Sequence, residues 1–313
     1  MRPIPPRFSS HSVGRSVRET PPVQAEVVVE GVRFGEGPAW CPPDSPGGTG
    51  TLVVTSVCDG KVLRVFPDEH RFEEVADTKG GPNGIALGTA GTFVVTQNGG
   101  IDFAAMGVFG DAPYRPVKPG LQVVRPEGKV SYLADVGFQA PNDLVVAPDG
   151  TVYFTDPPPF PPPAEPLGRV WAYEPDGNVR VIASRFSYCN GIALDRERNI
   201  VVVEGRGLQR VARDGEREWV IEHLGPGGGD GFCLDVDGNF YVATTVDHGV
   251  RVISPEGAEV GFLTIEGNGV TTNCCFGGAD NRTLFATDAV PGRVVAWDGL
   301  PTPGLPLTPW PAD

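Results

Sequence analysis

The sequence predicts an all-β protein that folds as a six-bladed β-propeller with four antiparallel strands in each blade. Three observations lead to this fold class. A segment that begins with a polar residue and continues as an apolar strand recurs six times, and each copy is followed by further short strands separated by tight turns. The 313 residues also include 43 Gly and 33 Pro. That content excludes a helical bundle or a coiled coil, because Gly and Pro both oppose helix interiors.

The first strand of each repeat starts at a polar residue, which we call its anchor. Successive anchors are separated by 47, 59, 48, 40 and 43 residues. A period of this size is typical of propeller blades, whereas a β-helix has shorter periods. After each anchor strand comes a second apolar strand, such as TFVVTQ in the second repeat or TVYFTD in the third. The six anchors are Glu36, Asn83, Asn142, Asn190, Asp230 and Asn273.

The third and fourth strands of each repeat alternate apolar and polar residues around PDG, PEG or RDG turns. These turns supply the positive φ that tight hairpins need. The sixth repeat lacks a fourth strand, and we expect residues 25–31 (AEVVVEG) to supply it, so that an N-terminal strand closes the ring. The predicted organisation is a disordered N-terminal tail over 1–24, a propeller over 25–300 and a Pro-rich C-terminal tail over 301–313.

Charge and composition limit the partners and the compartment. The net charge of −14 disfavours nucleic acid and anionic membranes. No apolar run approaches the ~18 residues of a membrane span. The first 22 residues lack the apolar stretch of a secretory signal, which favours the cytoplasm, with a transit peptide as the alternative. The six cysteines are interpreted as reduced thiols, and no feature specifies an oligomeric state.

The anchors predict a metal site. Because the first strand of each propeller blade lines the central axis, two carboxylates and four carboxamides should converge there without a basic residue. Such oxygens are hard ligands that suit Ca²⁺, Mg²⁺ or Mn²⁺, and two carboxylates balance a divalent charge. The alternative is that Asn-Gly and Asp-Gly are turn signals whose side chains cap strand ends. Glu36 favours the metal site, because Glu is a poor turn former.

The anchor motifs resemble those of the gluconolactonase/senescence-marker-protein (regucalcin-like) family over residues 25–298. The resemblance implies a six-bladed propeller with one divalent cation in its channel and, in many members, hydrolysis of sugar lactones. It implies Ca²⁺ as the favoured ion, with Zn²⁺, Mg²⁺ or Mn²⁺ as alternatives. The motifs are FGEGPAW, GPNGIAL, APNDLVV, CNGIALD, GDGFCLD and TTNCCFGG.

The same resemblance assigns roles to individual anchors. It implies Glu36, Asn190 and Asp230 as metal ligands, with Asn142 as a further ligand or a substrate contact. Asp230 is also the candidate catalytic residue, acting as the base that takes a proton from water. The small-molecule substrate would then be a lactone or a similar ester.

Further substrate contacts are expected around this centre. Asn83 and Asn273 are expected to orient water or substrate, and Asn98 and Asp156 end second strands beside long loops. For Asn98 and Asp156, the alternative is ordinary capping of a strand end. The PPPFPPP run at 157–163 is either a stiff connector or a rigid wall at the channel mouth with Phe160 against the substrate.

Two other functions remain open from the sequence. Similar propellers hydrolyse phosphotriesters or other esters, and Asp230 would act there as nucleophile rather than base. A non-catalytic, metal-binding regulatory propeller is the third possibility, although a scaffold has no need of an acidic axis.

Overall fold

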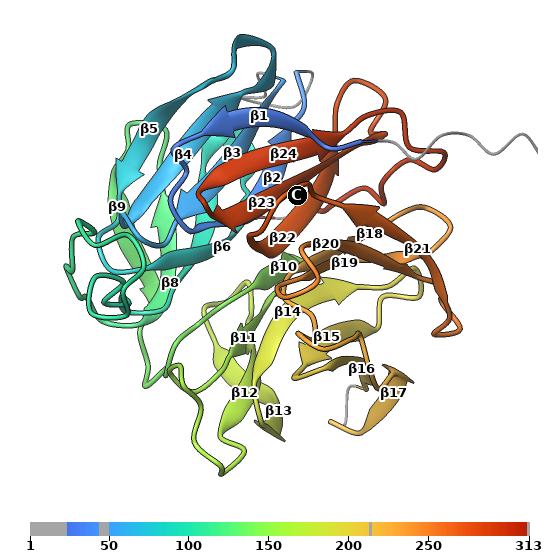
Figure 1. The fold of residues 1–313 in the computed structure, drawn as a ribbon. Coiled ribbons are helices and arrows are strands. Elements are labelled where there is room, and N and C mark those ends of the chain that lie inside the picture. Colours follow the sequence, from blue (N-terminus) through green and yellow to red (C-terminus); the bar gives the residue numbers. More distant parts are fainter. Residues whose placement is uncertain (1–23, 44–49, 213–214, 312–313) are drawn as a thin grey trace, which may run out of the picture.

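The computed structural model describes residues 24–43, 50–212 and 215–311, and the predicted disordered tail over 1–24 falls outside these except for its last residue. Six sheets of four antiparallel strands surround one axis (Figure 1). The innermost strands neighbour one another in chain order around the ring. The predicted six-bladed propeller is therefore confirmed.

Each blade runs from an innermost to an outermost strand. Blades 1 and 2 consist of β2 (Gly35–Cys41), β3 (Thr51–Ser56), β4 (Lys61–Phe66), β5 (Arg71–Asp77), β6 (Pro82–Leu87), β7 (Phe93–Gln97), β8 (Gly120–Val124) and β9 (Val130–Ala134). Blades 3 and 4 consist of β10 (Leu144–Val146), β11 (Val152–Asp156), β12 (Gly168–Tyr173), β13 (Val179–Phe186), β14 (Cys189–Leu194), β15 (Ile200–Glu204), β16 (Gly207–Val211) and β17 (Arg217–Ile221). Blades 5 and 6 consist of β18 (Phe232–Leu234), β19 (Phe240–Thr244), β20 (Gly249–Ile253), β21 (Glu259–Thr264), β22 (Val270–Gly277), β23 (Thr283–Val290), β24 (Arg293–Trp297) and β1 (Glu26–Glu30). Two short 3₁₀ turns, η1 (Pro67–Glu69) and η2 (Thr89–Gly91), complete the secondary structure of the described residues.

The ring closes between the two ends of the chain. Strand β1 pairs antiparallel with β24, placing Glu26 opposite Ala296 and Glu30 opposite Arg293. The N-terminal strand therefore supplies the fourth strand of blade 6, as predicted. This pairing leaves every blade with four strands, and the radial arrangement protects the edges of the sheets.

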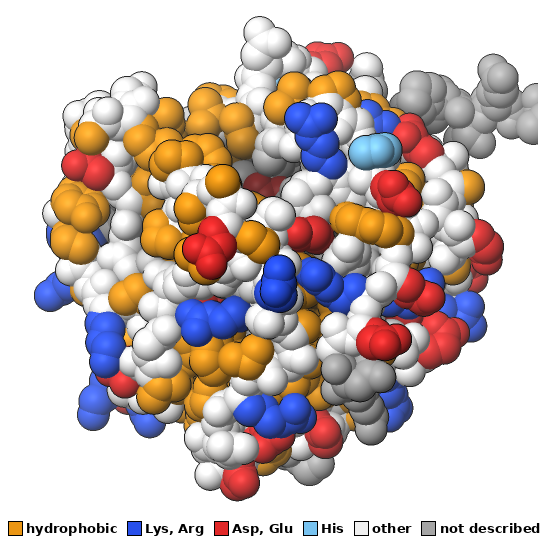
Figure 2. Space-filling view, turned by 90° about the horizontal axis from the view of Figure 1, so that it is seen from below, with side chains coloured by type: hydrophobic (Ala, Val, Ile, Leu, Met, Phe, Trp, Pro, Cys, Tyr) orange, Lys and Arg blue, Asp and Glu red, His pale blue; other side chains and the backbone are white. Residues whose placement is uncertain are grey.

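The core lies between the blades. Strand β3 is buried along its whole length, because its two faces pack against the two neighbouring blades. The second strands are therefore nearly continuous apolar runs, whereas apolar and polar residues alternate along the outer strands. Each outermost strand exposes one large apolar side chain. These side chains are Val27, Phe72, Tyr132, Val181, Trp219 and Val260. Figure 2, which looks at the side of blades 3 and 4, shows hydrophobic patches with Lys and Arg between them.

The two ends of the ring differ. We call one end of the ring the anchor end, because the innermost strands begin there and the second strands finish there. We call the opposite end the far end. The long connection over 98–119 lies at the anchor end and folds over blade 1, where Phe103 packs against Val57 and Cys58. Arg115 fastens it there by donating a hydrogen bond from Nη2 to the Asp59 carbonyl oxygen at 2.7 Å.

The C-terminal segment, predicted as a Pro-rich tail, packs against the far end. Leu305 N donates to the Leu234 carbonyl oxygen of blade 5 at 2.8 Å. Farther along, Trp310 N donates to the Leu87 carbonyl oxygen of blade 2 at 2.7 Å. Because blades 5 and 2 face each other across the ring, residues 301–311 cross the far end.

The described residues contain no helix with the length and apolar character needed to cross a bilayer.

Candidate functional site

The anchors lie in extended chain at the axis. Glu36, Asn83, Asn190 and Asn273 are inside innermost strands, and the other two anchors lie two residues before the start of theirs. Their Asn-Gly pairs are thus not tight turns. The glycines are required by the close approach of neighbouring blades: a Cβ on Gly191 would lie 2.4 Å from the Asp230 carbonyl oxygen. Small residues here allow the innermost strands to meet.

Threonine hydroxyls fix the backbone that carries the anchors. Thr55 Oγ1 in blade 1 donates to the Asn83 carbonyl oxygen in blade 2 at 2.7 Å. Thr155 Oγ1 in blade 3 makes the equivalent bond to Asn190 in blade 4, also at 2.7 Å. Since these bonds run from one blade to the next and are buried, they hold the anchors in register around the axis.

Side chains from distant blades meet at the axis. The Asn273 amide nitrogen lies 3.2 Å from Glu36 Oε2 and 3.0 and 3.1 Å from the two carboxylate oxygens of Asp143. Blades 6, 1 and 3 are therefore joined through one carboxamide. All three side chains are buried.

Asp143 is a site residue that sequence reasoning missed. It directly follows the anchor Asn142, at a position where four other blades have Gly and blade 6 has Cys. An acidic residue at that position was the available signal. Its presence raises the number of carboxylates at the axis from two to three, together with Glu36 and Asp230.

The three carboxyls affect one another's protonation. Burial raises the pKa of Glu36 well above its usual value, and the negative charges of Asp230 and Asp143 raise it further. Burial and then the charge of Asp143 raise the pKa of Asp230, against hydrogen bonds from Asn190 and the Gly231 backbone. Burial raises the pKa of Asp143 to about 7, although the Asn273 hydrogen bond opposes this shift. A bound cation would reverse these shifts, because it favours the ionised forms.

Oxygen atoms without partners surround these carboxyls. The Oδ1 atoms of Asn83, Asn142, Asn190 and Asp230 are buried and accept no hydrogen bond from the described residues. Such acceptors are costly unless a ligand or water satisfies them. Throughout the described ranges, no three His, Cys, Asp or Glu side chains form a metal-binding group by themselves. The donor set therefore fits a hard cation that uses carboxamide oxygens as well as carboxylates.

Tyr188 is a second residue that the sequence did not reveal. It lies in the connection from blade 3 to blade 4, two residues before Asn190. The pKa of its phenol is raised by burial and then by the negative charges of Asp230, Cys189 and Glu36. The phenol therefore lies within the electrostatic field of the axial carboxylates, and it remains a neutral hydrogen-bond donor.

The Asp156 carboxylate is buried, and both of its oxygens have hydrogen-bond partners within the protein. Its side chain is 0% exposed. One carboxylate oxygen accepts hydrogen bonds from the backbone of Gln139 and Ala140 at 2.8 and 2.9 Å, and the other accepts from Arg169 and Trp171 at 3.0 Å each. Asp156 thus holds the connection that leads to Asn142, and these contacts favour the alternative of strand-end capping over a substrate contact.

The remaining candidates divide between the axis and the periphery. Asn83, Asn142 and Asn273 lie with the axial group. Asn98 is half-buried at the start of the 98–119 connection, where its Oδ1 accepts a hydrogen bond from Gly100 N at 2.9 Å. It stays a candidate substrate contact at the edge of the anchor end.

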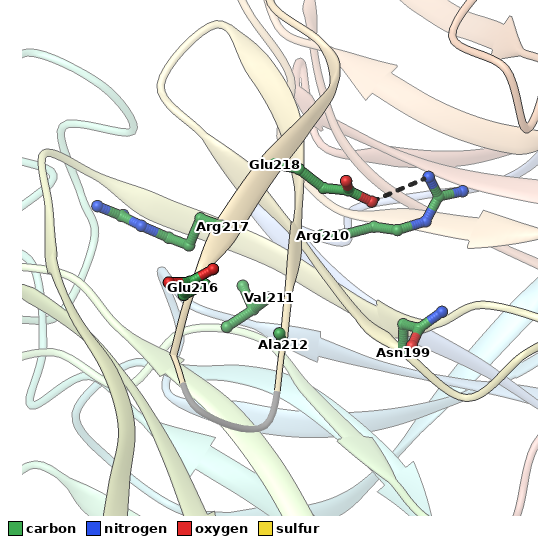
Figure 3. A pocket seen from close by; sticks show the side chains of 7 residues that line it. All are labelled: Asn199, Arg210, Val211, Ala212, Glu216, Arg217 and Glu218. Carbon is green, nitrogen blue, oxygen red and sulfur yellow. Dashed lines mark ion pairs between the residues drawn. The ribbon is translucent and has the colours of Figure 1, made fainter.

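A hollow of about 220 Å³ on blade 4 is unrelated to this site (Figure 3). It lies at the turn between β16 and β17, which is at the far end of the blade. Arg210 and Glu218 form an ion pair of 3.8 Å within it. Its lining residues are Asn199, Arg210, Val211, Ala212, Glu216, Arg217 and Glu218.

Comparison with known proteins identifies the family. Residues 34–290 match the SMP-30/gluconolactonase/LRE-like region, and the chain belongs to this family. It is 24% identical over 298 residues to a gluconolactonase of Zymomonas mobilis, covering 83% of this chain and 77% of that protein. It is 26% identical over 234 residues to the lactonase drp35 of Staphylococcus aureus, and the match covers 70% of this chain and 67% of that protein.

A solved structure shows the same fold. The calcium-binding protein regucalcin from Agrobacterium tumefaciens superimposes with a TM-score of 0.74 at 17% identity, covering 92% of this chain and 98% of that one.

Proposed function

We propose that this protein is a divalent-cation-dependent lactonase that opens the ring of a lactone by hydrolysis. The observation that carries the proposal is the convergence of Glu36, Asp143 and Asp230 with unpartnered carboxamide oxygens at the axis. Membership of the family and the names of the gluconolactonase and lactonase relatives support a hydrolase that acts on lactone esters.

Four anchors would hold the cation: Glu36, Asn142, Asn190 and Asp230. Two carboxylates balance the divalent charge, and the two carboxamides complete the oxygen shell without adding charge. Ca²⁺ is the proposed ion, supported by this donor chemistry and by the calcium-binding structural relative. When bound, such an ion polarises a carbonyl oxygen and stabilises the negative charge that develops on it during ester hydrolysis.

The chain's own residues then perform the proton chemistry. Asp230 accepts the proton of the attacking water through a carboxylate oxygen that has no protein partner. The Asn190 amide donates a hydrogen bond to the same carboxyl and fixes its orientation. Asn273 holds Glu36 and Asp143 in place, and Asn83 presents an unpartnered oxygen that can accept a hydrogen bond from water or substrate.

A substrate panel tests the proposed function. Purified protein is assayed on γ- and δ-lactones, an aryl ester and a phosphotriester, before and after removal of metal with a chelator and again after addition of Ca²⁺. The expected result is turnover of at least one lactone that disappears on chelation and returns with Ca²⁺. Turnover that persists after complete metal removal, or activity confined to the phosphotriester, would contradict the proposal.

A further inference from the structure

Tyr188 is held firmly at the anchor end. Its backbone N–H and that of Ser187 donate to the Glu204 carboxylate at 3.2 and 2.7 Å. The Tyr188 carbonyl oxygen accepts a hydrogen bond from Gly205 N at 3.2 Å. These contacts attach the connection to the end of β15, so the backbone that carries the phenol is fixed at the anchor end, two residues before the anchor Asn190.

Phe160 extends this aromatic surface outward. Its ring contacts the Tyr188 ring edge to face, with centroids 6.3 Å apart. The side chain is nevertheless 65% exposed, more than any other large aromatic side chain in the described ranges. Exposed apolar side chains on the outermost strands are common in this protein. Phe160 differs from them, because it lies on a loop at the anchor end and its ring contacts that of Tyr188.

The loop that carries Phe160 is stiff and poor in hydrogen-bond donors. Seven of the ten residues over 157–166 are Pro, which fixes φ and removes the backbone N–H. A rigid loop loses little conformational entropy when a ligand binds against it. A substrate whose hydroxyl groups faced this loop would lose hydrogen bonds to water and find carbonyl acceptors there but few N–H donors.

From this arrangement we propose that Tyr188 and Phe160 form a wall that selects lactones with an apolar substituent over fully hydroxylated sugar lactones. The inference rests on the proposed lactone hydrolysis and names the substrate class of that site. The lactone group faces the axial carboxylates, where the Tyr188 hydroxyl can donate a hydrogen bond to it. The alkyl or aryl substituent lies against Phe160 and the prolines.

Three substrates with the same ring size test the inference: δ-decalactone with its pentyl chain, unsubstituted δ-valerolactone and D-glucono-δ-lactone. The wild-type protein is expected to prefer δ-decalactone to D-glucono-δ-lactone by about tenfold or more in kcat/KM. Phe160→Ala is expected to lower kcat/KM for δ-decalactone by about tenfold, mainly through KM, and to leave δ-valerolactone nearly unchanged. Phe72→Ala is the matched control, because Phe72 is an exposed Phe on the outermost strand β5.

A binding measurement separates this inference from the proposed function. The lactam analogue of δ-decalactone resists hydrolysis, and its binding to wild-type and Phe160→Ala protein is measured by calorimetry. Binding that weakens about tenfold in the variant supports the wall even if no lactone is turned over, which would overturn only the proposed function. Lactone turnover that favours D-glucono-δ-lactone, or lactam binding that is absent or equal in both proteins, would overturn the wall.

Discussion

Replacing Asp230 with Asn is expected to lower kcat for lactone hydrolysis by roughly 10²- to 10⁴-fold, the range of a general base. The amide has nearly the same shape and keeps an oxygen at the axis, but it cannot take a proton from water. The measurement is steady-state kinetics at saturating Ca²⁺, so that a weaker affinity for the ion does not limit the rate.

Asp149→Asn serves as the control for this experiment. Asp149 lies in the turn between β10 and β11 at the far end of blade 3, where its carboxylate accepts a hydrogen bond from Thr151 N at 3.0 Å. This variant should retain wild-type kinetics, and both variants should unfold as cooperatively as the wild type. An Asp230→Asn protein with wild-type kcat would show that another group, such as Asp143, removes the proton.

The metal-free protein is expected to become less stable as pH rises. The folded-state pKa of Asp143 is raised from its usual 3.8 to about 7, so the stability that its protonated form contributes is fully present below about pH 4 and is lost as pH rises through 7. From pH 5.5 to pH 8.5 this one group should remove about 2 kcal/mol of unfolding free energy, and the raised pKa values of Glu36 and Asp230 act in the same direction. Denaturant unfolding at several pH values in metal-free buffer measures the effect.

Asp143→Asn provides the decisive comparison for the pH dependence. The amide oxygen can still accept the hydrogen bond from Asn273, but the third negative charge is absent. The variant should be more stable than the wild type at pH 8.5 without metal, and its stability should depend less on pH. Wild-type protein with saturating Ca²⁺ should not lose stability over this range. A metal-free wild type that gains stability from pH 5.5 to 8.5 would contradict the electrostatics of the site.

Much of the fold could be predicted because it repeats. The polar anchors and the apolar second strands recur in every blade, and Pro-Asp-Gly type turns join the outer two strands of blades 2 to 5, so local errors do not change the architecture. Closure by β1 was predictable because blade 6 lacked a strand and residues 25–31 had a strand pattern without a partner. The course of 301–311 across the far end was not predictable, because the segment is held by backbone hydrogen bonds and by two isolated apolar side chains, Leu305 and Trp310, which impose little sequence pattern.

The site could be predicted only in part. The anchors are visible because each occupies the same position in its repeat. Asp143 was missed because it occupies the place of a glycine and reaches across the ring to Asn273, a contact between residues 130 positions apart. Tyr188 lies two residues before its anchor, where none of the other five blades has a Tyr. No repeated pattern therefore marks it, and only the charges of Asp230 and Glu36 acting on its phenol reveal its relevance. For Asp156 the sequence left two interpretations open, because a strand-end aspartate that faces a ligand and one that binds a neighbouring loop look the same in sequence.

The central claim is that the axial carboxylates and carboxamides hold one divalent cation. Calorimetric titration of Ca²⁺ into metal-free protein tests it directly, with Glu36→Gln and Asp149→Asn as variants. The expected result is one ion per chain for the wild type and for Asp149→Asn, and an affinity at least about tenfold lower for Glu36→Gln, since a charged ligand is lost. Absence of binding, or a Glu36→Gln protein that binds Ca²⁺ as tightly as the wild type, would contradict the claim.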